Sequence, residues 1–187
     1  MSLLQKMFGK RQNRTHPYCA ALIAAAGSST RYGGENKLLQ TLDGIPVLVC
    51  TLLTIDRVEG IDEIVIAARE NELLPYAELC KAFGLRKPVK VIVGGATRTE
   101  SVLRAALEAS PETEFFAVQT PQVFAADLLK AALQSAIADG ATITDDCSAV
   151  ERMGKEVHLT EGSEENIKIT TPVDLAIAEA ILQRRGE

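Results

Sequence analysis

Apolar runs alternate with segments of helical pattern along this chain, and the alternation restricts the fold more than any other feature. Four runs rich in Ala, Ile, Val or Phe have the length of strands, namely residues 20–25, 61–68, 90–95 and 114–118. Strands that are apolar along their whole length must be covered on both faces. We therefore predict a three-layer α/β fold, with a mostly parallel, Rossmann-like sheet between two layers of helices.

Signals for helix ends separate these runs. Pro46 fits the first turn of a helix that runs to about residue 55, and Gly84 ends a helix that begins near residue 72. Thr97 and Glu100 have the spacing of a capping box before a helix that runs to about residue 109. The rest of the pattern predicts helices at 125–138 and 145–153, short strands at 157–159 and 166–170, and a last helix from a Thr171 cap to residue 184.

The length and charge of the chain limit its class. With 187 residues we expect a basic N-terminal tail at 1–18 and a single domain at 19–187. The tail carries four basic and no acidic side chains in its first fourteen residues, which is typical of a membrane-surface anchor or of a simple tail. A net charge of −5, with no Trp and only 4% aromatic residues, argues against nucleic-acid binding. No apolar run approaches the roughly 20 residues of a membrane span.

Four cysteines, Cys19, Cys50, Cys80 and Cys147, lie in or beside apolar or helical runs and lack the spacing of metal ligands. We therefore expect buried free thiols. Together with the lack of a recognisable signal peptide, this predicts a cytoplasmic location.

The stretch from Ala21 to Lys37, ALIAAAGSSTRYGGENK, predicts a strand that feeds a glycine-containing loop with two cations, Arg31 and Lys37. Backbone N–H groups in such a loop can surround an anion, and a polyphosphate is the natural guest. The loop matches neither GxGxxG nor a Walker motif, because five non-glycine residues follow Gly27 and Leu38 follows Lys37. On its own the loop is equally compatible with a plain strand-to-helix connection.

Five stretches together point to one family. AAAGSSTRYGGENKLL looks like the signature of the nucleotidyltransferase superfamily. The other stretches are GGATRTESV at 94–102, FAVQTPQVF at 116–124, DGATITDDCSAVE at 139–151 and EENIKITTPVDLAIAE at 164–179. Together they resemble 2-C-methyl-D-erythritol 4-phosphate cytidylyltransferase. The resemblance implies transfer of a cytidylyl group from CTP to that polyol phosphate, with release of pyrophosphate, in non-mevalonate isoprenoid biosynthesis.

The resemblance also implies roles for individual residues. Arg31, Lys37 and Lys168 match catalytic cations, and Thr120 and Lys168 match contacts to the substrate phosphate. CTP contacts are implied for Ala25, Ala26, Gly27, Ser28, Lys37, Gly94, Gly95, Ser101 and Lys168. Without the resemblance, Gly94 and Gly95 would be a turn before a capped helix, and Lys168 a solvent-facing side chain. Many members have Asp where Ala96 stands.

The chain departs from the family pattern in its middle. Members carry a motif His-Asp-(Ala/Gly)-Ala-Arg-Pro after the strand that corresponds to residues 115–118, and its Asp holds Mg²⁺. The motif does not occur in this sequence, which passes directly into FAVQTPQVF. We therefore expect an internal segment to be missing between about Glu114 and Phe116, with FFAVQT standing in for two strands. The family Asp is absent, so no metal-binding residue is predicted.

Two consequences follow from this departure. The missing segment would also hold the arm that joins the family homodimer, so a weak dimer or none is expected. Asp145 and Asp146 could replace the missing acid, but both stand at a helix start, where carboxylates complement the helix dipole. The alternatives to the family activity are a catalytically impaired CTP-binding remnant and a related cytidylyltransferase with another polyol phosphate, such as ribitol 5-phosphate.

Overall fold

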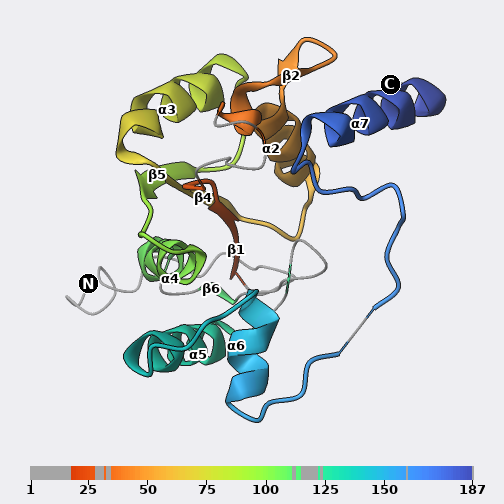
Figure 1. Ribbon diagram of the computed structural model, residues 1–187. Helices are drawn as coiled ribbons and strands as arrows, with labels where there is room; N and C mark the ends of the chain where they lie inside the picture. The colour runs from red at the N-terminus through yellow and green to blue at the C-terminus, as the bar shows by residue number, and fades with distance from the viewer. Residues whose placement is uncertain are drawn as a thin grey trace, which may run out of the picture.

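A parallel sheet forms the centre of the computed structural model, which describes residues 18–27, 32, 35–110, 113–114, 122, 124–158 and 160–186. Its strands are β1 (Tyr18–Ala24), β4 (Glu63–Ala68), β5 (Val89–Val93) and β6 (Thr113–Glu114), in the spatial order β5-β4-β1-β6. Every pairing in this sheet is parallel, as predicted (Figure 1). A small antiparallel hairpin, β2 (Thr41–Leu42) with β3 (Ile45–Pro46), follows the first loop.

Helices cover the sheet on both faces. On one face, α2 (Val47–Arg57) and α3 (Leu73–Ala82) pack with Ile64 and Ile66 of β4. On the other face, α4 (Arg98–Glu108) packs with Val65 and Ala67 of the same strand. Alternate side chains of a strand point to opposite faces, so the continuous apolar run of β4 is buried between the two layers. The predicted three-layer α/β fold is confirmed.

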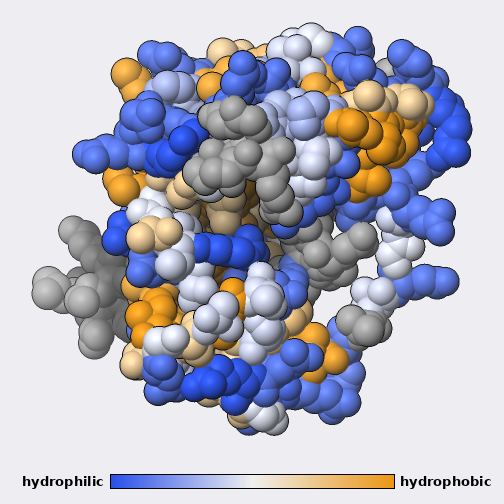
Figure 2. Space-filling model, in the orientation of Figure 1, coloured by the Kyte–Doolittle hydropathy of each residue, from blue (hydrophilic) through white to orange (hydrophobic). Residues whose placement is uncertain are grey.

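Three further helices complete the chain. The helices α5 (Ala126–Ala138) and α6 (Asp146–Arg152) pack beyond α4, through a cluster that includes Val102, Leu133 and Val150. The last helix, α7 (Pro172–Arg185), packs through Ala178 on Leu42 and Val47. A long connection joins α6 to α7 (Figure 1). Val173 and Ile177 of α7 are exposed, and an apolar patch lies over this helix (Figure 2).

The predicted helix caps are present. The Thr97 side chain accepts a hydrogen bond from Glu100 N, while the Glu100 carboxylate reaches back to Ala96 N and not to the cap residue. Thr171 and Asp174 form a complete capping box at the start of α7, with Pro172 in its first position. These ends were predictable because caps depend on residues three positions apart.

The strands predicted near the C-terminus are wrong. Residues 157–158 and 166–170 form no strand, while Leu159 lies outside the described residues. A strand needs a neighbour for its backbone hydrogen bonds, and β6 offers little, because its two described residues pair only with Tyr18 and Cys19 at the start of β1. Of the strand predicted at 114–118, only Glu114 is described. The basic tail is described only at Tyr18, which belongs to β1.

Two further predictions, on disulfides and on membrane-spanning helices, concern the described part of the chain. In those residues, none of Cys19, Cys50, Cys80 and Cys147 forms a disulfide, as predicted, although only Cys19 and Cys80 are buried. In the same residues, none of the helices has the length and apolar character to cross a lipid bilayer.

Candidate active site

The loops that follow β1 and β5 meet at the carboxyl end of β4. Ala25 N donates to Ala67 O (2.7 Å) and Gly94 N donates to Ala68 O (2.8 Å), so the two loops leave the sheet side by side. Ligands of open parallel sheets bind at this edge, beyond the ends of the strands. This edge of the sheet is therefore the candidate position for a ligand-binding site.

Gly94 allows the two loops to touch. A Cβ at this position would lie 2.6 Å from the Cβ of Ala26 and 3.0 Å from Oγ of Ser101, so only glycine fits. A Cβ at Gly95 would lie 2.2 Å from the Cβ of Glu100. The structure thus brings together Ala26, Gly94, Gly95 and Ser101, four of the residues predicted for CTP. The Ala25 side chain instead packs in the core with α2 and α3.

Ser101 holds the turn before α4 in place through hydrogen bonds of its side chain. Its side chain is buried, its Oγ accepts a hydrogen bond from Gly95 N (3.0 Å), and the hydroxyl donates to Thr97 O (2.9 Å). Arg104 adds a hydrogen bond to Gly94 O (2.8 Å). Ser101 therefore acts on the turn as a support, because its hydroxyl is engaged with backbone atoms.

Lys37 connects the first loop with a distant segment. Its Nζ donates to Ile169 O at 2.7 Å, across a separation of 132 residues, and Ile169 is the neighbour of Lys168. Two of the predicted cationic residues therefore lie on adjoining segments. Arg31, Ser28 and Thr120 lie outside the described residues, and Gly27 is exposed at the start of the loop.

A polar cavity of about 560 Å³ contains Lys168. It lies where α4 and α6 begin beside the connection to α7. Its lining residues are Arg98, Gln122, Thr144, Asp145, Glu164, Asn166, Ile167 and Lys168. Arg98 and Gln122 of this lining were not predicted from the sequence. Arg98 had a usable signal, since it opens the helix directly after the Gly94–Thr97 turn.

Two carboxylates beside this cavity are already engaged. Asp145 caps α6 and accepts hydrogen bonds from Ser148 N (2.8 Å) and Gln122 Nε2 (3.1 Å). The hydrogen bond from Ser148 N is the main reason why the pKa of Asp145 is lowered. Asp146 is buried, which raises its pKa, while Arg98 at 2.7 Å opposes that rise. The Gln122 side chain accepts from Asp146 N (2.9 Å) and Cys147 N (3.2 Å).

These contacts decide whether the described residues can hold Mg²⁺. Among them, no three His, Cys, Asp or Glu side chains gather as a metal-binding group. The Asp145 carboxylate accepts hydrogen bonds as the cap of α6, and the Asp146 carboxylate accepts one from Arg98. The described residues therefore offer no preformed group of three such ligands for Mg²⁺.

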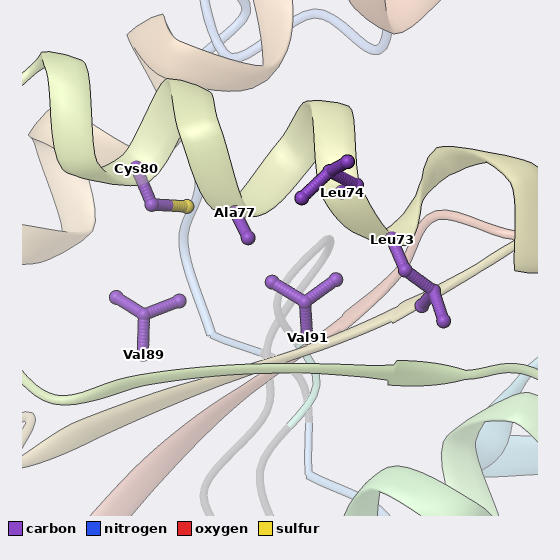
Figure 3. A pocket seen from close by; sticks show the side chains of 6 residues that line it. All are labelled: Leu73, Leu74, Ala77, Cys80, Val89 and Val91. Carbon is purple, nitrogen blue, oxygen red and sulfur yellow. The ribbon is translucent and has the colours of Figure 1, made fainter.

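A second hollow, of about 400 Å³, lies between α3 and β5. Figure 3 shows side chains of the helix facing those of the strand across it. It is lined by Leu73, Leu74, Ala77, Cys80, Val89 and Val91. This hollow has no charged side chain, so it does not suit a phosphate.

The family model described as IspD, 2-C-methyl-D-erythritol 4-phosphate cytidylyltransferase, matches residues 19–116 and 106–184. The chain belongs to this cytidylyltransferase family. A protein from Bacillus cytotoxicus with the name 2-C-methyl-D-erythritol 4-phosphate cytidylyltransferase is 35% identical over 223 residues, covering 88% of this chain and 98% of its own length. A protein of the same name from Synechococcus is 32% identical over 229 residues, covering 89% and 97%.

Solved structures support the cytidylyltransferase fold. A crystal structure of 4-diphosphocytidyl-2C-methyl-D-erythritol synthase from Anaerococcus prevotii has a TM-score of 0.76 at 23% identity, covering 89% of this chain and 96% of its own. A Thermus thermophilus 2-C-methyl-D-erythritol 4-phosphate cytidylyltransferase has a TM-score of 0.63 at 23% identity, covering 87% and 98%. Both likenesses concern the arrangement of helices and strands.

The cytidylyltransferase match has two parts, which overlap at residues 106–116. The alignment with the Bacillus cytotoxicus relative runs over 223 residues, more than the 187 of this chain, so part of the relative faces a gap. The overlap contains the predicted break near Glu114 and Phe116. That FFAVQT stands in for two strands remains a prediction.

Proposed function

We propose that this chain transfers a cytidylyl group from CTP to 2-C-methyl-D-erythritol 4-phosphate. The observation that carries the proposal is the contact of Lys37 Nζ with the carbonyl oxygen of Ile169, 2.7 Å away, which sets the first loop against the segment of Lys168. Transfer of this kind builds up negative charge around the attacked phosphorus. Fixed cations stabilise that charge better than water does.

Each part of the site has a task in this proposal. The turn of Gly94 and Gly95, together with Ala26, receives the cytosine, while Ser101 holds the turn in shape. The first loop surrounds the triphosphate, to which Ala25, Gly27 and Ser28 would contribute backbone atoms. An oxygen of the acceptor phosphate attacks the α-phosphorus. The bond from that phosphorus to the bridging oxygen of the β-phosphate breaks, and pyrophosphate leaves.

The cations complete the proposed reaction. Lys37 and Arg31 would neutralise the charge on the triphosphate, and Lys168 and Thr120 would bind the acceptor phosphate. The cavity that Lys168 lines is our candidate for the acceptor pocket. By family resemblance Mg²⁺ accompanies the phosphates of CTP. We propose a cytoplasmic setting as well, which is supported by four cysteines that form no disulfide among the described residues.

The two-part family match favours a second candidate, a CTP-binding protein with little turnover. Residues present in the relatives have no counterpart in this chain. By resemblance, the metal-holding Asp and the dimer arm would be among them. Under either candidate we expect a monomer in analytical ultracentrifugation. A stable dimer at micromolar concentration would contradict the loss of the arm.

Pyrophosphate release with CTP, the methylerythritol phosphate and Mg²⁺ tests the proposal. Lys37→Ala and Lys168→Ala should each lower the rate by roughly 10²-fold or more, as loss of a transition-state charge contact does. A rate equal to that of Lys37→Ala would refute turnover by this chain. Ribitol 5-phosphate tests the other acceptor.

Thermal shifts with CTP, UTP, GTP and ATP separate the two candidates when turnover is absent. A shift with CTP alone would support the binding protein. Preference for a purine nucleotide would contradict both candidates, because the proposed turn is built for cytosine.

A further inference from the structure

Asn36, the residue before Lys37, ties the first loop to the helix that follows β4. Its Nδ2 donates to Glu72 Oε1 (2.6 Å) and to Tyr76 Oη (2.9 Å). Its Oδ1 accepts from Leu38 N (3.0 Å), which caps the short 3₁₀ turn at Lys37–Leu39. One side chain therefore fixes the backbone on both sides of Lys37.

The partners of Asn36 are buried. Tyr76 in α3 is fully buried, and Glu72, the last residue of the 3₁₀ turn Glu70–Glu72, is 5% exposed. Arg69 forms an ion pair with the Glu72 carboxylate, so the buried charge is compensated. A buried polar network resists distortion, because a shift breaks the hydrogen bonds that its members make. Here the polar atoms of Asn36, Glu72 and Tyr76 are hydrogen-bonded, while the buried Nε of Arg69 has no partner among the described residues.

We infer that Asn36, Glu72 and Tyr76 are positioning residues that hold Lys37 where it meets the triphosphate of CTP. The inference rests on the proposed function. A lysine has a long flexible side chain, and ordering it reduces the binding energy that its charge contributes. Here Asn36 fixes the backbone on both sides of Lys37, and the carbonyl of Ile169 accepts a hydrogen bond from the Lys37 Nζ. Such preorganisation increases what a charged contact contributes to binding.

Binding of CTP and of cytidine by calorimetry tests this inference. Tyr76→Phe removes one acceptor of Asn36 and keeps the shape of the ring, whereas Asn36→Ala removes the whole connection. We expect CTP binding to weaken about threefold and about tenfold respectively, as the loss of a hydrogen bond of this kind predicts. Cytidine has no phosphates, so its affinity should stay within about twofold of wild type.

The same substitutions in a Lys37→Ala background give the decisive comparison. If Asn36 and Tyr76 act through Lys37, their effects on CTP binding disappear in that background, because interacting residues are not additive. Effects of unchanged size there, or equal losses for CTP and cytidine, would overturn the inference. Wild-type protein that fails to bind CTP would instead refute the proposed function, and the inference with it.

Asp56→Asn is a matched control for general destabilisation. Asp56 is also a buried carboxylate, and it accepts hydrogen bonds from Arg86 and Lys87. It lies where α2 ends and β5 is about to begin, at the amino end of the strands and away from Lys37. This variant should lower the unfolding temperature and leave the ratio of CTP to cytidine affinity unchanged. A changed ratio would show that the readout follows stability, which would also overturn the inference.

Discussion

The guanidinium of Arg98 lies 2.7 Å from Oδ2 of Asp146, so the first turn of α4 is tied to the first turn of α6. Arg98 follows the Gly94–Thr97 turn, and Asp146 stands beside the cavity that contains Lys168. The pair thus couples the two halves of the proposed site. It joins a carboxylate that is largely buried to a cation that remains partly in water.

Replacing Arg98 by Ala should destabilise the fold, because Asp146 would keep its buried charge without a partner. We expect a loss of about 1–3 kcal/mol in the free energy of unfolding, measured with urea, since the exposed side of Arg98 reduces its contribution. Arg152→Ala is the control. Its pair with Asp139 is exposed on both sides, so a loss below about 1 kcal/mol is expected. Equal losses would contradict this account.

Gly94→Ala should damage the fold and CTP binding together. The added Cβ would lie 2.6 Å from that of Ala26, so the loops after β1 and β5 must separate. We expect about 1–3 kcal/mol of destabilisation, as for other overpacked sites. Gly60→Ala is a matched control, because a Cβ there meets nothing within 4 Å. Gly94→Ala protein with wild-type stability and CTP affinity would refute the close contact.

Ser101→Ala should loosen the turn before α4. Gly95 N–H would lose its acceptor in a half-buried place, which costs about 1–2 kcal/mol in the free energy of unfolding. Ser135→Ala serves for comparison, since its hydroxyl makes only an exposed contact of 3.5 Å with Asp139. That variant should stay within about 0.5 kcal/mol of wild type. If both serines behave alike, Ser101 does not support the turn.

The stabilisation that Asp174 provides at the cap of α7 should be lost in acid. The hydrogen bond from Thr170 N is the main reason why the pKa of Asp174 falls to about 2, below its ordinary 3.8. Since the folded-state pKa is the lower one, this carboxylate stabilises the fold above about pH 4, and the stabilisation is lost as the pH falls through about 2.

Urea midpoints of wild type and Asp174→Asn, compared across pH, measure this effect. The difference between the two proteins should be constant from pH 7 to about pH 4 and should shrink below that. A difference that does not change with pH would show that Asp174 is not stabilised as a carboxylate.

Local sequence pattern was enough to predict most of the fold. Each central strand carries its own apolar run, and Thr97 and Thr171 carry their own caps, so neither depends on distant residues. The segment around Lys168 is different. Its apolar and polar residues alternate as in a strand. A strand also needs a partner strand for its backbone hydrogen bonds, and the local sequence does not show whether one is present.

The residues of the proposed site also differ in whether the local sequence predicts them. Gly94, Gly95 and Ser101 could be predicted as site residues because their motif is contiguous. The connection from Asn36 to Tyr76 was missed, because a lone Asn and a lone buried Tyr have no pattern that links them. Only the packing of α3 against the first loop brings their polar atoms within hydrogen-bond distance.

The position of β4 has a consequence for how the molecule opens. All six of its residues are buried, and it pairs with β1 on one side and β5 on the other. Its amide protons should therefore be among the slowest to exchange with deuterated water, and only global unfolding should release them. The loops at its carboxyl end lie outside this protected unit. Under the proposed function, the cytidylyl product and pyrophosphate would leave and CTP would enter at these loops while the central strand stays closed.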